Sequence, residues 1–172
     1  RWAPRENDKR DSGLLYRVTG PQAVFAMWPS SLEAQIQEGD VGDFWAIAGA
    51  GARVKTVPAA AGGPGRYDPS GEPKRVASLR GVSNVVKRFD EEKAGDWNTL
   101  EVACLGRTCT HAVNGKLVMV LEDTFSCGTD CNEATARPLE SGSIELQSEG
   151  AEIFYRTIEV RPLRAWPAHM RP

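Results

Sequence analysis

Carboxylate and amide side chains alternate with apolar ones in the segment Leu32–Gln37. Because residues two apart in a β-strand share a face, this segment predicts a strand with one polar and one core-facing side. The polar side carries Glu33, Gln35 and Gln37. A carboxylate can remove a proton and amides can bond hydroxyl groups, so this side has the chemistry of a polar ligand site.

Two further segments show the same split. In Ser143–Gln147 the polar side carries Glu145 and Gln147, and in Gly13–Arg17 it carries Arg17. Their apolar sides consist of Leu14, Tyr16, Ile144 and Leu146. We expect the three polar sides to form one surface. Because an antiparallel sandwich commonly has one solvated face, a plain wet surface stays an alternative to a site.

Aromatic residues add a second requirement of a saccharide site, since planar rings cover the apolar face of a sugar. Trp28, Trp45, Trp97 and Tyr67 are the candidates. Core packing explains most tryptophans in a domain of this size equally well. The aromatic residues alone therefore leave both interpretations open.

The sequence has two histidines, His111 and His169, and His169 lies in a proline-interrupted tail that we expect to fray. His111 falls in a predicted strand, where it is either a buried, hydrogen-bonded side chain or a base or metal ligand. The sequence contains no Gly-x-Ser-x-Gly elbow, phosphate-binding loop or dinucleotide fingerprint. Serine hydrolysis and nucleotide-dependent chemistry thus lack support.

Four cysteines permit three disulfide pairings. If Gly106-Arg107 is a two-residue hairpin turn, Cys104 faces Cys109 across the strands, and Cys127 is left to pair with Cys131. A four-thiolate zinc site and free buried thiols are the alternatives. The disulfide interpretation favours an oxidising compartment, periplasmic or extracellular.

Short alternating runs between glycine, proline and asparagine predict an all-β protein of stacked sheets. Asn114-Gly115 is the strongest hairpin signal, because both central positions of a type I′ turn need positive φ. We expect a meander over 99–121, long loops over Gly49–Arg75 and Thr124–Leu139, and a further strand over Val85–Asp90. The other predicted strands are Gly13–Val18, Leu32–Gln37, Phe44–Ala48, Thr99–Leu105, Thr108–Val113, Lys116–Leu121, Ser143–Gln147 and Ile153–Val160.

Length and charge limit the function classes. The 172 residues suit one domain, and 21 Lys+Arg against 23 Asp+Glu give a formal net charge of -2. A nucleic-acid binder usually has a basic excess, so we expect no such partner. The longest apolar runs, such as Ala23–Trp28, are too short to span a membrane.

The ordered motifs of the chain resemble the 3-keto-disaccharide hydrolase family, formerly a domain of unknown function. These motifs are Asp11-Ser-Gly-Leu-Leu-Tyr-Arg17, Leu32-Glu-Ala-Gln-Ile36, Gly42-Asp-Phe-Trp45, Asp96-Trp-Asn98, His111-Ala-Val-Asn-Gly115, Gly142-Ser-Ile-Glu-Leu-Gln147 and Ile153-Phe-Tyr-Arg-Thr-Ile-Glu-Val160. The chain departs from the family pattern at Asp11, Glu145, Glu149 and Thr157.

The resemblance implies a concanavalin-A-like jelly roll of two curved sheets in an exported protein. Family domains begin with further strands before Asp11, so we expect this chain to lack its N-terminal strands. The expected domain covers residues 1–163, and residues 164–172 form a tail.

The resemblance also implies cleavage of 3-keto-glycosides by removal of the C2 proton, elimination of the C1 substituent and hydration. Glu33 and His111 are the candidate bases. The expected sugar-binding residues are Arg17, Gln35, Trp45, Gln147 and Glu149. Arg17, Gln35 and Gln147 are also expected to bind the developing oxyanion, and a divalent metal held by Glu33, His111 or Glu149 is a candidate to share that role.

A binding module that holds glycans without turnover is the second function that the same face allows, because lectin-like sandwiches often do this. A structural domain of a larger exported protein is the third. The partner expected for the first two is a saccharide.

Overall fold

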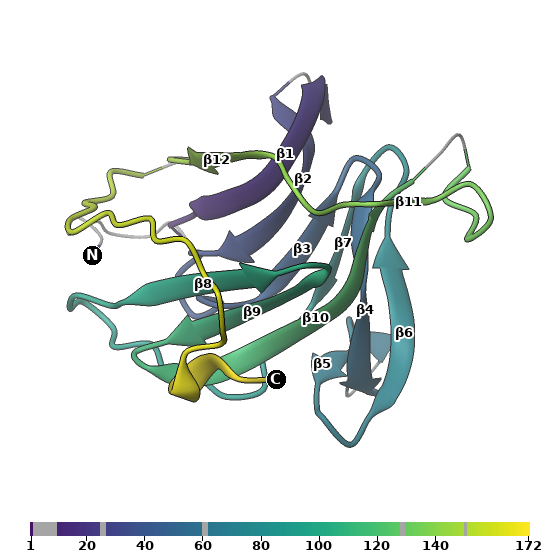
Figure 1. Cartoon of the computed structure of the whole chain (residues 1–172). Helices are drawn as coiled ribbons and strands as arrows, with labels where there is room; N and C mark the ends of the chain where they lie inside the picture. Colours follow the sequence, from purple (N-terminus) through teal and green to yellow (C-terminus); the bar gives the residue numbers. More distant parts are fainter. Residues whose placement is uncertain (2–9, 25–26, 60–61, 128–129, 150) are drawn as a thin grey trace.

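In a computed structural model that describes residues 1, 10–24, 27–59, 62–127, 130–149 and 151–172, two antiparallel β-sheets pack against each other (Figure 1). The five-stranded sheet has the order β12 (Ser143–Leu146), β1 (Gly13–Val24), β2 (Trp28–Gln35), β3 (Phe44–Ile47) and β7 (Val82–Val85). The seven-stranded sheet has the order β5 (Arg66–Tyr67), β4 (Ala50–Val57), β10 (Lys116–Ser126), β9 (Thr108–Val113) and β8 (Leu100–Leu105), with β6 (Glu72–Ala77) on β4 and β11 (Arg137–Pro138) on β10. The predicted all-β sandwich is confirmed, whereas its jelly-roll winding stays a prediction.

The main core lies between the two sheets. The five-stranded sheet contributes Tyr16, Leu32, Ala34, Phe44 and Ala46, and the seven-stranded sheet contributes Val54, Val113, Met119 and Leu121. These residues alternate with outward-facing ones along their strands, which is the pattern that a sheet buried on one side requires. The opposite side of β1, β2 and β3 is thereby turned away from the second sheet.

The predicted meander is present as β8, β9 and β10. Leu105 pairs with Thr108 and Cys104 with Cys109, as the Gly106-Arg107 turn requires. At the next turn Asn114 and Gly115 have φ values of 50° and 81°, the positive angles expected of a type I′ hairpin.

The prediction of one long loop over Gly49–Arg75 is wrong, because this range contains β4, β5 and the start of β6. Within β4 the buried Ala52, Val54 and Thr56 alternate with less buried residues. Gly51 weakens the sequence signal but is needed, since a Cβ there would lie 2.5 Å from the Val76 carbonyl oxygen of neighbouring β6.

Several predicted strands have other bounds in the structure, as β1, β2 and β10 do, and two are largely absent. Residues 82–85 form β7, so only Val85 of the predicted Val85–Asp90 lies in it. The predicted strand Ile153–Val160 does not form, and Ile158 and Val160 are 68% and 77% exposed. Among the described residues, Ile153 makes a single β-bridge and the Phe154 N–H donates to the Arg1 carbonyl oxygen, so pairing does not continue along the segment.

The tail does not fray. Ala168–Met170 forms a short 3₁₀-helix, and Met170 is buried against Ala103 and Ala112 on the outer side of the seven-stranded sheet. Apolar burial of this kind stabilises a terminal segment that composition alone suggests is loose. No helix in the described ranges is long and apolar enough to cross a membrane.

Of the two predicted disulfides, one is present. Cys127 and Cys131 are bonded, whereas Cys104 and Cys109 are free thiols although they face each other in register. The prediction of a Cys104–Cys109 disulfide is therefore wrong: strand pairing brings two cysteines together but does not by itself oxidise them. A zinc site built from all four cysteines is contradicted as well, because two of the thiols are consumed in the disulfide.

Candidate functional site

The side of the five-stranded sheet that faces away from the core carries the candidate site. Leu15, Glu33 and Trp45 are directly aligned across β1, β2 and β3. We call this surface, together with Gln35 and the Gln147 that follows β12, the outer face. An apolar cluster that includes Leu15, Ile47, Trp28 and Trp45 covers part of it. Apolar side chains thus cover much of the face that the sequence predicts to be polar and solvated.

Glu33 is the most unusual residue of the outer face, because it is 5% exposed and no described residue donates a hydrogen bond to its carboxyl group. Burial, with smaller contributions from the charges of Asp11 and Glu149, raises the pKa of Glu33 to about 8. Gly13 makes room for the carboxyl group, since a Cβ at this position would collide with it. The result is a carboxyl group that can hold or release a proton near neutral pH.

A hydrogen-bonded chain of side chains lies beside Glu33. The Trp28 indole N–H donates to the Gln147 amide oxygen at 3.1 Å, and the Gln147 amide nitrogen donates to Glu149 Oε2 at 2.7 Å. Burial and the charge of Asp11 raise the pKa of Glu149. Because both ends of Gln147 are held, its side chain has a fixed orientation.

These residues border a shallow hollow with a volume of about 290 Å³. It is lined by Leu15, Met27, Trp28, Pro29, Glu145, Leu146, Gln147, Ser148 and Glu149. The hollow adjoins Glu33, since its lining residue Leu15 is the cross-strand neighbour of Glu33. Aromatic, aliphatic and polar groups meet there, as in many sites for small ligands.

Trp45 adds a donor to this side of the sheet. Its indole Nε1 is buried and has no hydrogen-bond acceptor among the described residues. A buried donor without an acceptor is costly, so such a group is a candidate contact for a ligand oxygen. Trp45 and Glu33 pair directly across β3 and β2, so an unused donor and an unused acid are neighbours.

Arg17 is not on the outer face. It has a φ of 52° at an irregularity in β1, and its guanidinium donates to Thr124 and to the backbone carbonyls of Leu139 and Gly106 in the region of the second sheet. The bulge turns this side chain to the same side as Tyr16 rather than opposite to it. The expected convergence of Arg17 with Glu33 and Gln147 is therefore wrong for Arg17.

His111 also lies between the sheets and is fully buried. Its Nδ1 contacts the Gly42 carbonyl oxygen at 3.1 Å, and its Nε2 contacts the Tyr16 hydroxyl at 2.7 Å. Nδ1–H donates to the carbonyl, which leaves Nε2 to accept from the hydroxyl. Burial lowers the pKa of His111 to about 4, so the ring is a neutral link between the sheets and is remote from the outer face.

Gln35 lies on the outer face but its acceptor is already used. It is 5% exposed, and its amide oxygen accepts from the backbone N–H groups of Ile36 at 2.8 Å and Gln37 at 3.1 Å. The side chain therefore closes the end of β2. Sequence alternation places such a residue on a face but does not reveal this local bond.

The residues expected to hold a divalent metal do not suit one. Glu33 and Glu149 belong to the outer face of the five-stranded sheet, whereas His111 belongs to β9 of the other sheet and lies between the two sheets. In the part of the chain that is described, no three His, Cys, Asp or Glu side chains form a group suited to a metal ion.

Asp11, Ser12, Gly13 and Tyr155 also belong to this site, although none of them is among the site residues that the sequence predicts. The Tyr155 hydroxyl bonds Ser12 and donates to the Gln147 carbonyl oxygen at 2.9 Å, so the chain after β12 is tied to β1. The sequence signal for them is the Asp11-Ser-Gly13 run, whose glycine is the first residue of β1. What it lacked was the register that brings Gly13 beside Glu33.

Comparison with known proteins adds a family. A search of curated proteins and a search of solved structures each find no match. Residues 1–161 match the family described as the 3-keto-alpha-glucoside-1,2-lyase-like domain, which supports a carbohydrate-related function. The Cys127–Cys131 disulfide and this family together fit a periplasmic or extracellular location. With all but its last residues matched, the chain belongs to the 3-keto-alpha-glucoside-1,2-lyase-like domain family.

Proposed function

We propose that the protein cleaves 3-keto-glycosides on the outer face, with Glu33 as the base. The observation that carries this proposal is the buried Glu33 carboxyl group, which has no hydrogen-bond donor among the described residues and a pKa raised to about 8. A base is most effective when its pKa lies near the working pH. An ordinary exposed glutamate would be a much weaker base for a proton on carbon.

The reaction begins at C2 of the sugar, whose hydrogen is acidified by the ketone at C3. The Glu33 carboxylate takes this proton, and the electron pair of the C–H bond forms an enolate. The enolate then expels the C1 substituent, which takes the proton from Glu33 and leaves as the aglycone, and a double bond forms between C1 and C2. Addition of water across this bond gives the free 3-keto-sugar.

Neighbouring groups suit the other needs of this chemistry. We assign to the Trp45 indole N–H a hydrogen bond to the C3 oxygen, where negative charge develops in the enolate. Gln147 and Glu149 line the adjoining hollow and are suited to bind hydroxyl groups, while Trp28 offers an apolar surface to a sugar ring. Arg17, Gln35 and His111 have no part in this assignment.

The experiment measures aglycone release from a chromogenic 3-keto-glucoside. Wild-type protein should release the aglycone faster than the uncatalysed reaction, and Glu33→Gln should lower kcat by at least about 100-fold, the usual scale of a lost general base. Glu72→Gln, an exposed glutamate of β6, is the matched control and should keep full activity. Undiminished turnover by Glu33→Gln would remove Glu33 from the mechanism.

Binding without turnover is the second candidate, and the covered position of Glu33 favours it, because a 5% exposed carboxyl group meets little solvent. In that case unmodified glucosides bind in the hollow beside Trp28 and Gln147, and the keto-glucoside gives no product. The same assay, run with calorimetric titration of both sugars, separates the two functions.

A further inference from the structure

A second hollow lies on the seven-stranded sheet, well away in the fold from the outer face. Its volume is about 320 Å³. Four arginines line it together with two carboxylates, Phe125 and residues of the 136–138 segment; the arginines are Arg53, Arg75, Arg107 and Arg137, and the acids are Asp123 and Glu133. The side chains that line the hollow therefore have a net charge of +2.

The two acids are engaged with only two of the arginines. Asp123 lies 3.8 Å from Arg53 and 3.5 Å from Arg107, and Glu133 pairs with Arg53. Within the described ranges Arg75 and Arg137 have no ion pair. Two guanidinium groups of the hollow are therefore available to an external anion.

Arg75 is held in place without a carboxylate. Its guanidinium lies over the Phe125 ring, 3.4 Å from the centroid, and donates to the Cys131 carbonyl oxygen at 3.2 Å. Burial and the nearby charge of Arg53 lower the pKa of Arg75. A cation that is positioned by stacking beside a like charge is ready to accept an anion, since an anion would relieve the repulsion.

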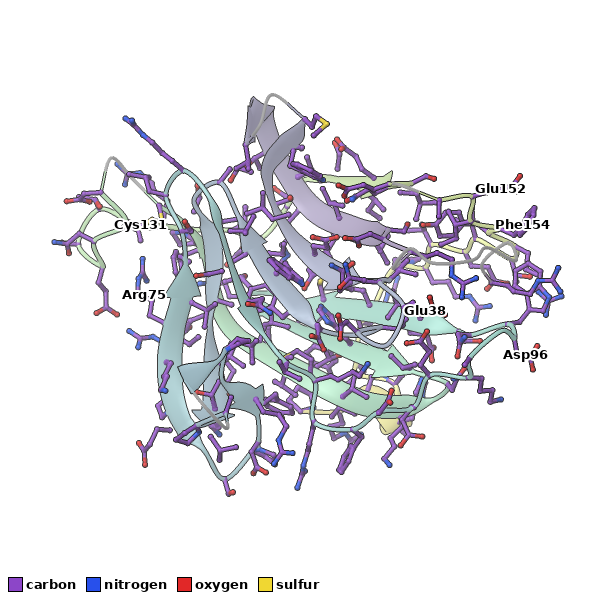
Figure 2. The ribbon with its side chains drawn as sticks, turned by 180° about the vertical axis from the view of Figure 1, so that it is seen from behind. Glu38, Arg75, Asp96, Cys131, Glu152 and Phe154 are labelled. Carbon is purple, nitrogen blue, oxygen red and sulfur yellow. A yellow bond between two sulfur atoms is a disulfide. The ribbon has the colours of Figure 1, made fainter. Side chains whose placement is uncertain are left out.

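The local backbone supports the same arrangement. Asp123 has a φ of 49° at an irregularity in the pairing of β10 with β4, which is unusual for a residue other than glycine. Cys131, which is disulfide-bonded to Cys127, accepts the Arg75 hydrogen bond with its carbonyl oxygen, and Figure 2 shows Arg75 and Cys131 on the same side of the molecule.

We propose that this hollow binds an oxyanion, the carboxylate or sulfate-type group of an acidic ligand, through Arg75 and Arg137 with help from Arg53. Guanidinium groups match such anions because they donate paired hydrogen bonds. Glu133 competes with an external anion for Arg53, because its carboxylate pairs with Arg53 and its side chain is 69% exposed. This inference does not rest on the proposed cleavage of keto-glycosides.

The test is calorimetric titration of the folded protein at low ionic strength with inorganic sulfate, inorganic phosphate, glucuronate and glucose. We expect saturable binding of at least one anion at one site and no binding of glucose. Glucuronate and sulfate separate planar from tetrahedral anions. Anion binding should weaken about 10-fold in Arg75→Gln and in Arg137→Gln, the scale of one lost charged hydrogen bond.

Two further variants keep the proposal falsifiable if Arg75→Gln proves unstable. Glu133→Gln removes the competing carboxylate and should tighten anion binding several-fold. Arg164→Gln, an exposed arginine outside the hollow, should leave it unchanged. Absence of saturable anion binding in the folded wild-type protein, equal weakening by Arg164→Gln, or no gain from Glu133→Gln would overturn the proposal.

Discussion

Glu33 in β2 and His111 in β9 are two buried titratable groups, one on each sheet, and burial shifts their pKa values in opposite directions. Burial favours the neutral form of each, which raises the pKa of Glu33 and lowers that of His111. His111 satisfies both ring nitrogens within the protein, whereas Glu33 receives no hydrogen bond from the described residues. The first is therefore a structural group and the second is the candidate for chemistry.

The raised pKa of Glu33 makes a prediction about stability. Between pH 4.5 and 8 the folded protein holds a proton that the unfolded chain has lost, so Glu33 lowers the free energy of unfolding as pH rises through this range. The free energy of unfolding of Glu33→Gln, relative to that of wild type, should therefore rise by up to about 5 kcal/mol between pH 4 and pH 9. Most of the rise falls between pH 4.5 and pH 8, at about 1.4 kcal/mol for each pH unit.

Urea unfolding at the two pH values measures this gain, with Glu72→Gln as the control that should show none. A difference between Glu33→Gln and wild type that is the same at both pH values would contradict the raised pKa.

His111 makes the complementary prediction at acid pH. Its pKa is about 6.5 in the unfolded chain and about 4 in the folded protein, so the unfolded chain binds the extra proton between these values. The contribution of the neutral His111 ring to the free energy of unfolding is full above pH 6.5. It falls by about 3 kcal/mol in total as the pH drops toward 4.

The variant His111→Gln should be less stable at neutral pH and should lose less on acidification than wild type. His169→Gln, at the exposed histidine of the tail, leaves the buried network intact and should behave as wild type. Denaturant unfolding from pH 7 to pH 4 distinguishes the two. Parallel pH curves for wild type and His111→Gln would show that the buried ring does not carry this dependence.

At the scale of the strands, pairing register decides which predicted residues meet. The period-2 pattern of β2 correctly separates Glu33 and Gln35 from Leu32 and Ala34, because β2 is regular in this part. In β1 the same reasoning fails at Arg17, since an irregularity with positive φ inverts the alternation. Bulges of this kind have no reliable signal in a single sequence.

The contact of Gly13 with Glu33 gives a prediction at this scale. Gly13→Ala should lower both stability, by about 1–3 kcal/mol, and turnover, because the new Cβ meets the Glu33 carboxyl group. Truncating Glu33 removes the obstacle, so the stability cost of Gly13→Ala should largely vanish in a Glu33→Ala background. A double-mutant cycle in urea measures the coupling. Additive effects of the two changes would contradict this contact.

At the scale of the whole molecule, the sequence predicts the sandwich but only part of the site. Short alternating segments and the Asn114-Gly115 turn were sufficient for the two-sheet class and for the meander. The range Gly49–Arg75 looks like a loop in the sequence because it is rich in glycine. Only the structure shows that Gly51 lies in a strand, where neighbouring backbone leaves no room for a Cβ. Side chains of Glu33, Trp45, Gln147 and Glu149 do gather on or beside the outer face, while Arg17 and His111 join the sheets internally.

The two faces then have separate chemistry. The outer face of the five-stranded sheet holds a buried acid beside an apolar and amide-lined hollow, and the seven-stranded sheet holds the arginine-lined hollow. A sandwich of this type keeps both surfaces accessible because its core lies between the sheets. The proposed cleavage and the proposed anion site can therefore be tested one at a time.

The most direct test of the central claim is the deuterium content at C2 of the 3-keto-sugar formed from a 3-keto-glucoside in D₂O, measured by mass spectrometry at early times against an enzyme-free control. Removal of the C2 proton and later hydration should place solvent deuterium at C2 in the wild-type reaction, and Glu33→Gln should form almost no product. A product that retains its original C2 hydrogen, or full turnover by Glu33→Gln, would contradict the account.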